Sequence, residues 1–201
     1  MELKELKAET VTEIYHQYMI TDFPQNELKP LERILYTMEI GLCCAYGIYE
    51  QDNLRGYAIF IVPDGLRYGL LDYLAVLNAY RGTGVGHEFF ELIGETLSAK
   101  YPLMKGFFIE SENIEYAADA QERDIRERRI AFYTKNKCSL TAMESKLFGV
   151  TYSILTYNFD KKDDTPALLE DLNNVYTAMF KKSHYDNNVD LWDNAAKRNM
   201  D

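Results

Sequence analysis

Three glycines stand in a short loop between an apolar stretch and a helical pattern. Gly82, Gly84 and Gly86 follow the run Leu70–Val76 and precede residues 89–97, where apolar side chains recur at helical spacing. Glycine lets a ligand approach the backbone closely, and the first N–H groups of a helix have no partner within it. A strand, a glycine loop and a helix N-terminus therefore predict a site for a phosphorylated ligand.

Spacing excludes two common phosphate loops. Counted from Gly82, the dinucleotide pattern G-x-G-x-x-G requires glycine at position 87, which is His87, and no window gives G-x-x-x-x-G-K-[ST]. The remaining pattern is Arg81-x-x-Gly84-x-Gly86. It resembles the coenzyme A pyrophosphate loop of the GNAT superfamily of acyl-CoA-dependent N-acyltransferases, whose pattern is Gln/Arg-x-x-Gly-x-Gly/Ala.

Two further segments carry this resemblance. Residues 72–76, Asp-Tyr-Leu-Ala-Val, are similar to the central strand of the family, although Asn78 replaces the proline that often follows. Residues 129–136, which include Tyr133, are similar to a later helix of the family, although Lys137-Cys138 replaces the usual Gly-Phe. The order of elements agrees from about residue 3 to residue 158.

The resemblance implies how acetyl-CoA, the expected co-substrate, is bound without a metal. The loop N–H groups would hold the pyrophosphate, and the pantetheine arm would pair with the strand edge, where an N–H near Leu74 or Val76 would polarise the thioester carbonyl. The residues assigned to the cofactor are Leu74, Ala75, Val76, Arg81, Gly82, Thr83, Gly84, Val85 and Gly86. The alternatives are a tight turn for the glycines and a surface position for Arg81.

Acyl transfer to an amine requires that the amine lose a proton and that the leaving thiolate gain one. Tyr133 matches the family tyrosine that protonates the sulfur. An ammonium with a pKa near 10.4 cannot attack, so a base is needed. Glu110 and Asp72 are the assigned bases and Glu112 is a further candidate. Each is alternatively a solvated carboxylate or a partner of Arg128 or Arg129, and water alone serves some family members.

The elements that position these residues follow from periodicity and turn residues. Residues 3–8 fit either a strand or a helix start, and Thr10 with Glu13 predicts a capping box. The sequence predicts helices over 10–22, 30–40, 86–100 and 123–136, and strands over 42–49, 55–62, 68–77, 106–110, 140–143 and 151–157. The resemblance implies an α/β fold with a mixed, mostly antiparallel central sheet flanked by helices.

The last 41 residues differ in character, so we expect an acyltransferase domain over 1–160 and a helical, polar extension over 161–201. Lys161–Asp164 is a polar linker, Thr165-Pro166 begins a helix with an apolar stripe, and Leu191 and Trp192 are late apolar anchors. The extension would pack on the domain or on a second subunit, which would make a homodimer.

Composition limits the partners. The net charge of −10 argues against a nucleic-acid binder. Three cysteines without a CxxC pair predict no disulfide framework, and the charged first residues predict no signal peptide. The longest apolar stretch, Ile40–Tyr49, is far too short to span a membrane. We therefore expect a cytoplasmic protein.

The acceptor is a small-molecule amine or a protein amine. The candidates to line the acceptor site are Tyr15, Tyr18, Phe23 and the loop 22–29. The alternative is that all four only pack against the rest of the domain. Residues 119–124 are either an acidic rim for a cation or a solvated helix start. Two other functions stay open, a non-catalytic acyl-CoA-binding module and an unrelated nucleotide-binding fold.

Overall fold

The computed structural model describes residues 1–25, 27–159 and 167–194. Eight strands, mostly antiparallel, and the helices around them form a mixed α/β fold in this part of the chain, which confirms the predicted fold class. The chain divides into two units. Unit 1 comprises Met1–Asp64 and Leu71–Lys100, and unit 2 comprises Gly65–Leu70 and Tyr101–Asp201.

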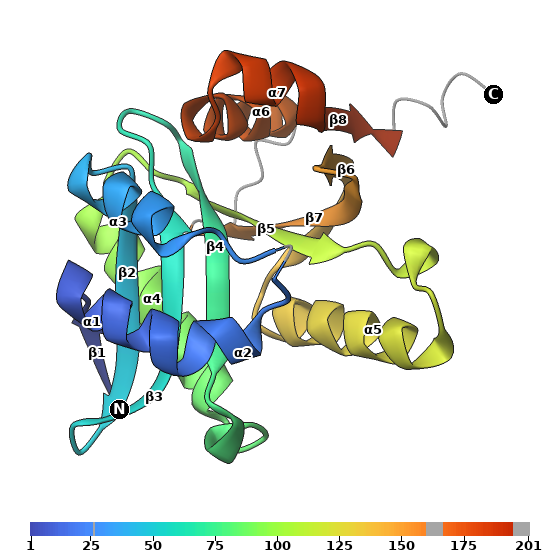
Figure 1. Ribbon diagram of the computed structural model, residues 1–201. Coiled ribbons are helices and arrows are strands. Elements are labelled where there is room, and N and C mark those ends of the chain that lie inside the picture. The colour runs from blue at the N-terminus through green and yellow to red at the C-terminus, as the bar shows by residue number, and fades with distance from the viewer. Residues whose placement is uncertain (26, 160–166, 195–201) are drawn as a thin grey trace. The chain divides into compact units, whose positions relative to one another are not determined.

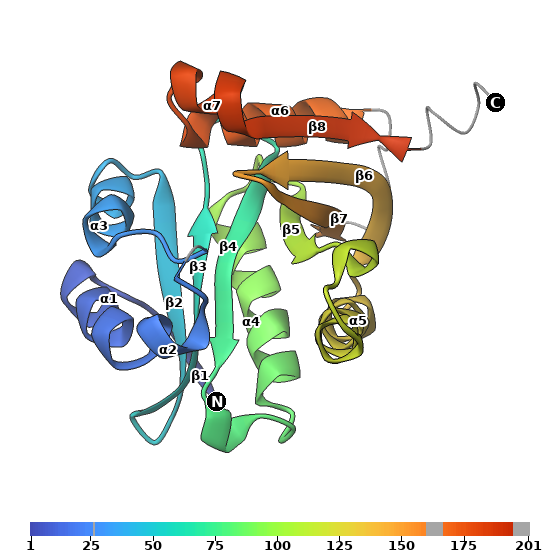
Figure 2. The ribbon, with the colours of Figure 1, turned by 45° about the vertical axis from the view of Figure 1, so that its right-hand side comes forward.

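Unit 1 has a layer of strands with helices on both faces. Its strands are β1 (Glu2–Glu5), β2 (Cys43–Glu50), β3 (Asn53–Ile61) and most of β4 (Tyr68–Val76), hydrogen-bonded in that order. Its helical segments are α1 (Ala8–Ile14), the π-helix η1 (Tyr15–Met19), α2 (Ile20–Asp22), α3 (Leu31–Glu39), the short 3-10 turn η2 (Asn78–Tyr80) and α4 (Val85–Lys100). Figures 1 and 2 show α1, α2 and α3 on one face of the strands and α4 on the other. Met19, Phe60 and Phe89 are almost fully buried as a result.

Most boundaries in unit 1 follow the sequence, with one error at the first helix. The predicted capping box at Thr10 is wrong, because α1 already begins after Lys7, whose side chain makes no capping hydrogen bond. The backbone N–H of Leu6 donates to the carbonyl oxygen of Ala45 at 2.8 Å, so strand pairing holds the chain until two residues before the helix. Thr10 therefore lies inside the first turns of the helix.

Unit 2 has its own layer of antiparallel strands. They are β5 (Gly106–Glu112), β7 (Val150–Asn158), β6 (Ser139–Leu147) and β8 (Val189–Asp193), hydrogen-bonded in that order. The helical segments are η3 (Ile114–Tyr116), α5 (Ala120–Lys135), α6 (Leu168–Met179) and α7 (Lys182–Asn188). In Figure 1, α5 lies on one side of these strands, and α6 and α7 lie on the other.

The start of α5, the length of β6, and the elements α7 and β8 differ from the sequence prediction. Helix α5 starts at residue 120 because the Asp119 side chain accepts a hydrogen bond from the Glu122 N–H at 2.8 Å, so residues 119–124 begin a helix. Strand β8 was not expected, and it contains both predicted anchors, Leu191 and Trp192. An acidic rim at 119–124 stays a prediction.

The C-terminal extension falls only partly within the described residues. The predicted linker at 161–164 and the helix start at 165–166 lie outside them, whereas α6, α7 and β8 belong to unit 2. The domain boundary after residue 160 stays a prediction. No helix in the described ranges is long and apolar enough to cross a membrane.

Candidate active site

The glycine loop turns through two left-handed backbone positions just before α4. Gly82 has φ 76° and Gly84 has φ 92°, and a Cβ atom added at either position would meet no atom within 4 Å. The Gly84 carbonyl accepts hydrogen bonds from the N–H groups of His87 and Glu88 at 3.0 and 3.2 Å, so Gly84 caps the helix. Backbone conformation, rather than packing, requires glycine here.

The N–H groups of this loop are suited to an anion. In the part of the chain that the structure describes, we find no hydrogen bond donated by the N–H of Gly82, Thr83 or Gly84. The Thr83 Oγ1 atom donates to the Tyr80 carbonyl at 2.6 Å, which fixes the turn. Because α4 follows directly, its positive end adds to these donors.

Arg81 already has two partners. Its Nε atom donates to the Val76 carbonyl at 2.9 Å, and its Nη2 atom donates to Asp22 Oδ1 at 3.1 Å. The other oxygen of Asp22 accepts from the Tyr57 hydroxyl at 2.8 Å. The Asp22 side chain is 10% exposed and that of Arg81 is 55% exposed. A phosphate would therefore have to compete with a largely buried carboxylate for this guanidinium.

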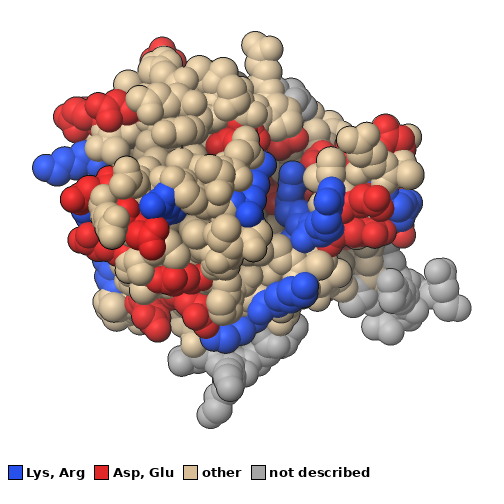
Figure 3. Space-filling model, turned by 90° about the horizontal axis from the view of Figure 1, so that it is seen from below, with Lys and Arg blue, Asp and Glu red and all other residues tan. Residues whose placement is uncertain are grey.

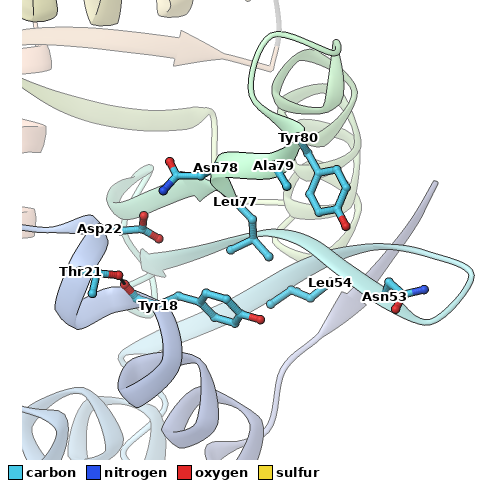
Figure 4. Close-up of a pocket in the computed structure, with 9 residues that line it drawn as sticks. All are labelled: Tyr18, Thr21, Asp22, Asn53, Leu54, Leu77, Asn78, Ala79 and Tyr80. Carbon is cyan, nitrogen blue, oxygen red and sulfur yellow. Dashed lines mark hydrogen bonds between the residues drawn. The ribbon is translucent and has the colours of Figure 1, made fainter.

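A pocket of about 420 Å³ lies in unit 1 at the end of β4. Figure 4 shows its lining, which comes from η1 and α2, the start of β3, and η2 with the residue before it. The lining residues are Tyr18, Thr21, Asp22, Asn53, Leu54, Leu77, Asn78, Ala79 and Tyr80. The pocket combines tyrosine rings, amides and one carboxylate, which are groups that suit a polar or cationic ligand.

Only part of the predicted acceptor region lines this pocket. Tyr18 and Asp22 do so. Tyr15 instead donates its hydroxyl proton to the Lys29 carbonyl at 3.2 Å, and the Phe23 ring packs edge-on against Tyr73 with centroids 4.9 Å apart. Tyr15 and Phe23 therefore pack against Lys29 and Tyr73 and do not line the pocket.

The predicted pairing edge lies on β4. Leu74 and Val76 are half-buried, whereas Ala75 between them is buried. A Cβ atom at Gly56 would lie 2.7 Å from the Ala75 carbonyl oxygen, so glycine on β3 allows the two strands to approach closely. The strand is where the sequence predicts it, and its pairing with pantetheine stays a prediction.

Asp72 is held by a lysine. Its two oxygens lie 2.6 and 2.7 Å from the Lys29 Nζ atom, and its side chain is 11% exposed. The Lys29 N–H also donates to the Tyr73 hydroxyl at 2.9 Å, and burial raises the pKa of Tyr73. A base role for Asp72 would require the ion pair to break first.

Glu112 is bound by two arginines of α5. Arg126 Nη2 and Arg129 Nη1 lie 3.0 and 3.2 Å from its two oxygens. Arg126 is 6% exposed and also pairs with Glu122 at 2.6 Å. Arg128, named as a partner from the sequence, instead donates to the backbone of its own helix. Glu112 belongs to a structural ion cluster.

Glu110 has a different environment. It is half-buried on β5, and one of its oxygens accepts a hydrogen bond from the Tyr176 hydroxyl of α6 at 2.5 Å. The same hydroxyl lies 3.0 Å from Ser145 Oγ on β6. Sequence reasoning missed both partners, because Tyr176 stands in an apolar stripe where a tyrosine indicates packing.

Tyr133 lies near the end of α5 and is 8% exposed. Burial raises its pKa to about 12, while the nearby Arg129 opposes that change. The phenol therefore keeps its proton at neutral pH. The atypical cap after this helix is also explained, since Lys137 takes a φ of 66°, the left-handed conformation that glycine usually supplies.

Charged side chains of both signs lie on the surface (Figure 3), as their numbers in the sequence lead one to expect. On the face drawn in Figure 3, acidic and basic side chains are interspersed. We find no cluster of three His, Cys, Asp or Glu side chains placed to hold a metal in residues 1–25, 27–159 and 167–194. All three cysteines are buried and unbridged.

Comparisons with known proteins identify the fold. No family model matches the sequence, and no curated protein matches it either. A GNAT-family acetyltransferase structure from Bacteroides thetaiotaomicron is 18% identical, with 88% of this chain and 97% of that chain covered at a TM-score of 0.68.

Two functionally described enzymes have the same fold. The ribosomal-protein-S18-alanine N-acetyltransferase from Escherichia coli is 14% identical, with 82% of this chain and 97% of that chain covered at a TM-score of 0.57. An aminoglycoside 6'-N-acetyltransferase complexed with coenzyme A is 13% identical, with 82% and 100% covered at a TM-score of 0.59. The chain has the fold of the GNAT acetyltransferases, and the resemblance stated from the sequence is confirmed at that level.

Proposed function

We propose that this protein is an acyl-CoA-dependent N-acyltransferase that moves an acetyl group from acetyl-CoA to a primary amine. The observation that carries the proposal is the segment Gly82–Gly86, which contains two left-handed glycines and runs into the first turn of α4. Proteins of the same fold have been crystallised with coenzyme A. The pyrophosphate would bind this loop, and pantetheine would pair along Leu74–Val76.

The amine attacks the thioester directly in a ternary complex. The new C–N bond forms as the C–S bond breaks, the amine proton passes to a base, and the thiolate takes a proton from Tyr133. Burial keeps that phenol protonated but also makes it a weaker acid, so the transfer requires a direct hydrogen bond from the phenol to the sulfur. Holding two reactants in line is worth roughly 7–11 kcal/mol in favourable cases, so positioning supplies much of the rate.

Glu110 is the best of the three candidate bases. Asp72 and Glu112 each have both carboxylate oxygens bound by cationic side chains at 2.6–3.2 Å, so an ion pair must break before either carboxylate accepts a proton. One oxygen of Glu110 accepts a hydrogen bond from the neutral Tyr176 hydroxyl. We therefore assign the amine proton to Glu110, directly or through water.

The acceptor is a small-molecule or protein amine, and the enzyme acts in the cytoplasm. The named relatives act on a ribosomal-protein alanine and on aminoglycosides, so the fold serves both kinds of acceptor. In this chain, the pocket beside Tyr18 and Asp22 offers tyrosine rings to a cation, while both oxygens of Asp22 are already bound by Arg81 and Tyr57. A homodimer built through the extension is part of the same proposal.

The test is thiol release from acetyl-CoA across a panel of polyamines, aminoglycosides, amino acids and lysine or N-terminal peptides. Tyr133→Phe should leave coenzyme A affinity unchanged and slow turnover about a hundredfold. Tyr116→Phe, which alters an exposed tyrosine in the same unit, is the matched control. Tight coenzyme A binding by calorimetry with no release for any amine would favour the non-catalytic binding module.

A further inference from the structure

The C-terminal helix α6 brings a buried hydroxyl to the predicted base. Tyr176 is fully buried, and its hydroxyl proton is donated to Glu110, 66 residues earlier in the chain. The Oγ atom of Ser145, which is also fully buried, lies 3.0 Å from the same hydroxyl. Three elements of unit 2, namely β5, β6 and α6, thus meet at one oxygen atom.

The residues around the Tyr176 hydroxyl determine which hydroxyl group donates each hydrogen bond. A phenol carries one proton, so when Tyr176 donates it to Glu110, the Ser145 hydroxyl is left to donate to the phenol oxygen. Burial, followed by the charge of Glu110, raises the pKa of Tyr176 well above its ordinary value. Among the residues that the structure describes, the titratable groups that raise the pKa of this hydroxyl are Glu110 from β5 and Tyr152 from β7. Tyr176 therefore stays a donor throughout the working pH range.

Helix α6 is fixed well enough to aim this donor. Leu172 and Val175 are fully buried on the same helix. Asp171, one turn earlier, is 8% exposed and receives two hydrogen bonds from Arg67, at 3.2 Å from Nε and 2.7 Å from Nη2. Packing alone would be satisfied by phenylalanine at 176, so the hydroxyl requires its own explanation.

We infer that Tyr176 is a positioning residue for Glu110: the C-terminal extension orients the base and stabilises its ionised form. This inference rests on the proposed function, because it assigns Glu110 the amine proton. A hydrogen bond donated to a carboxylate favours the charged state and restricts the side chain to one orientation. The extension thereby contributes to the chemistry through a residue that touches no substrate.

The experiment compares two tyrosine variants of the full-length protein. Tyr176→Phe removes the donor to Glu110, and Tyr185→Phe removes a hydroxyl of the same C-terminal segment that bonds Asn173 instead. With Tyr176→Phe, the acidic limb of kcat/KM against pH should move to higher pH, and kcat at neutral pH should fall roughly tenfold. Tyr185→Phe should leave the limb in place, and neither variant should change coenzyme A affinity.

A second readout does not require turnover. Carbon NMR of labelled glutamate side chains follows the titration of Glu110, with Glu110→Gln assigning its resonance. Tyr176→Phe should raise the pKa of Glu110 relative to the parent protein. An unchanged titration and an unmoved limb would overturn the inference, even if the variant were less stable. If Tyr176→Phe raised the pKa of Glu110 but the parent protein transferred no acyl group, the hydrogen bond between the two residues would be supported and the proposed function would be rejected.

Discussion

The Arg81 guanidinium is bound to a carboxylate in the structure, although the loop beside it is suited to phosphate. Asp22→Asn removes the negative charge and releases the guanidinium, so coenzyme A should bind roughly three- to tenfold more tightly, as measured by calorimetry. Tyr57→Phe is the control, because it removes the other hydrogen bond to Asp22 without altering charge. Unchanged or weaker binding by Asp22→Asn would mean that Arg81 does not contact the ligand.

Cys138 makes stability depend on pH in a defined direction. Burial raises the pKa of its thiol from 9.0 to about 12, so the unfolded chain loses this proton first. The contribution of the protonated thiol to the free energy of unfolding is complete below pH 9. It is lost as the pH rises towards 12, by up to about 1.4 kcal/mol per pH unit.

Cys138→Ala should therefore show a shallower fall in the free energy of unfolding between pH 9 and 11, measured with denaturant. The cavity left by the smaller side chain costs the same at every pH, so each variant is compared with its own value at pH 8. Parallel pH curves for the two proteins would show that this thiol titrates with the same pKa in the folded and unfolded states.

At the scale of elements, a substitution at Gly84 tests two roles of the glycine loop, its backbone conformation and its binding of coenzyme A. Alanine at Gly84 has room for its methyl group but must adopt a φ near 92°, at a cost of about 1–2 kcal/mol. The methyl group also enters the open space that an anion would use, so Gly84→Ala should weaken coenzyme A binding as well as stability.

Gly65→Ala is the matched control for this loop. Gly65 has φ 73° and equally open surroundings, yet it lies in a separate turn. Thermal unfolding should show similar losses for the two variants, whereas calorimetry should show weaker coenzyme A binding only for Gly84→Ala. Equal coenzyme A affinity in both variants would remove the loop from the binding site.

Elements with strong local patterns were predictable, and those that depend on distant partners were not. Apolar periodicity located β4 and α4, and glycine spacing located the turn between them. Strand β8 has no strong pattern of its own. It exists because β6 offers an edge, along which Leu191 pairs with Ser145.

The candidate site follows the same rule. The loop residues are neighbours in sequence, so their arrangement was predictable. The Lys29–Asp72 pair spans 43 residues and the Tyr176–Glu110 hydrogen bond spans 66, so no local pattern indicates either contact. The sequence named three carboxylates, and only their distant partners distinguish a candidate base from structural ion pairs.

At the scale of the whole molecule, the C-terminal segment covers a strand edge. A chain that ends at residue 159 lacks α6, α7 and β8, so the backbone groups of β6 that pair with Val189–Asp193 become an open edge and the core loses the packing of α6. We expect this truncated chain to self-associate and to unfold at a lower temperature. Light scattering and thermal unfolding measure the two effects, and a chain ending at residue 194 is the control. A monomeric, equally stable truncation would show that β8 is dispensable.

The buried cysteines decide how activity can be followed. Burial raises the pKa of Cys43 to about 11 and that of Cys138 to about 12, and Cys44 is also buried. At pH 8 only about one Cys43 thiol in a thousand is ionised, and fewer at Cys138, while thiolate is the form that reacts with disulfide reagents. The folded protein should therefore contribute almost no background colour, and a thiol reagent added to the reaction should report coenzyme A alone.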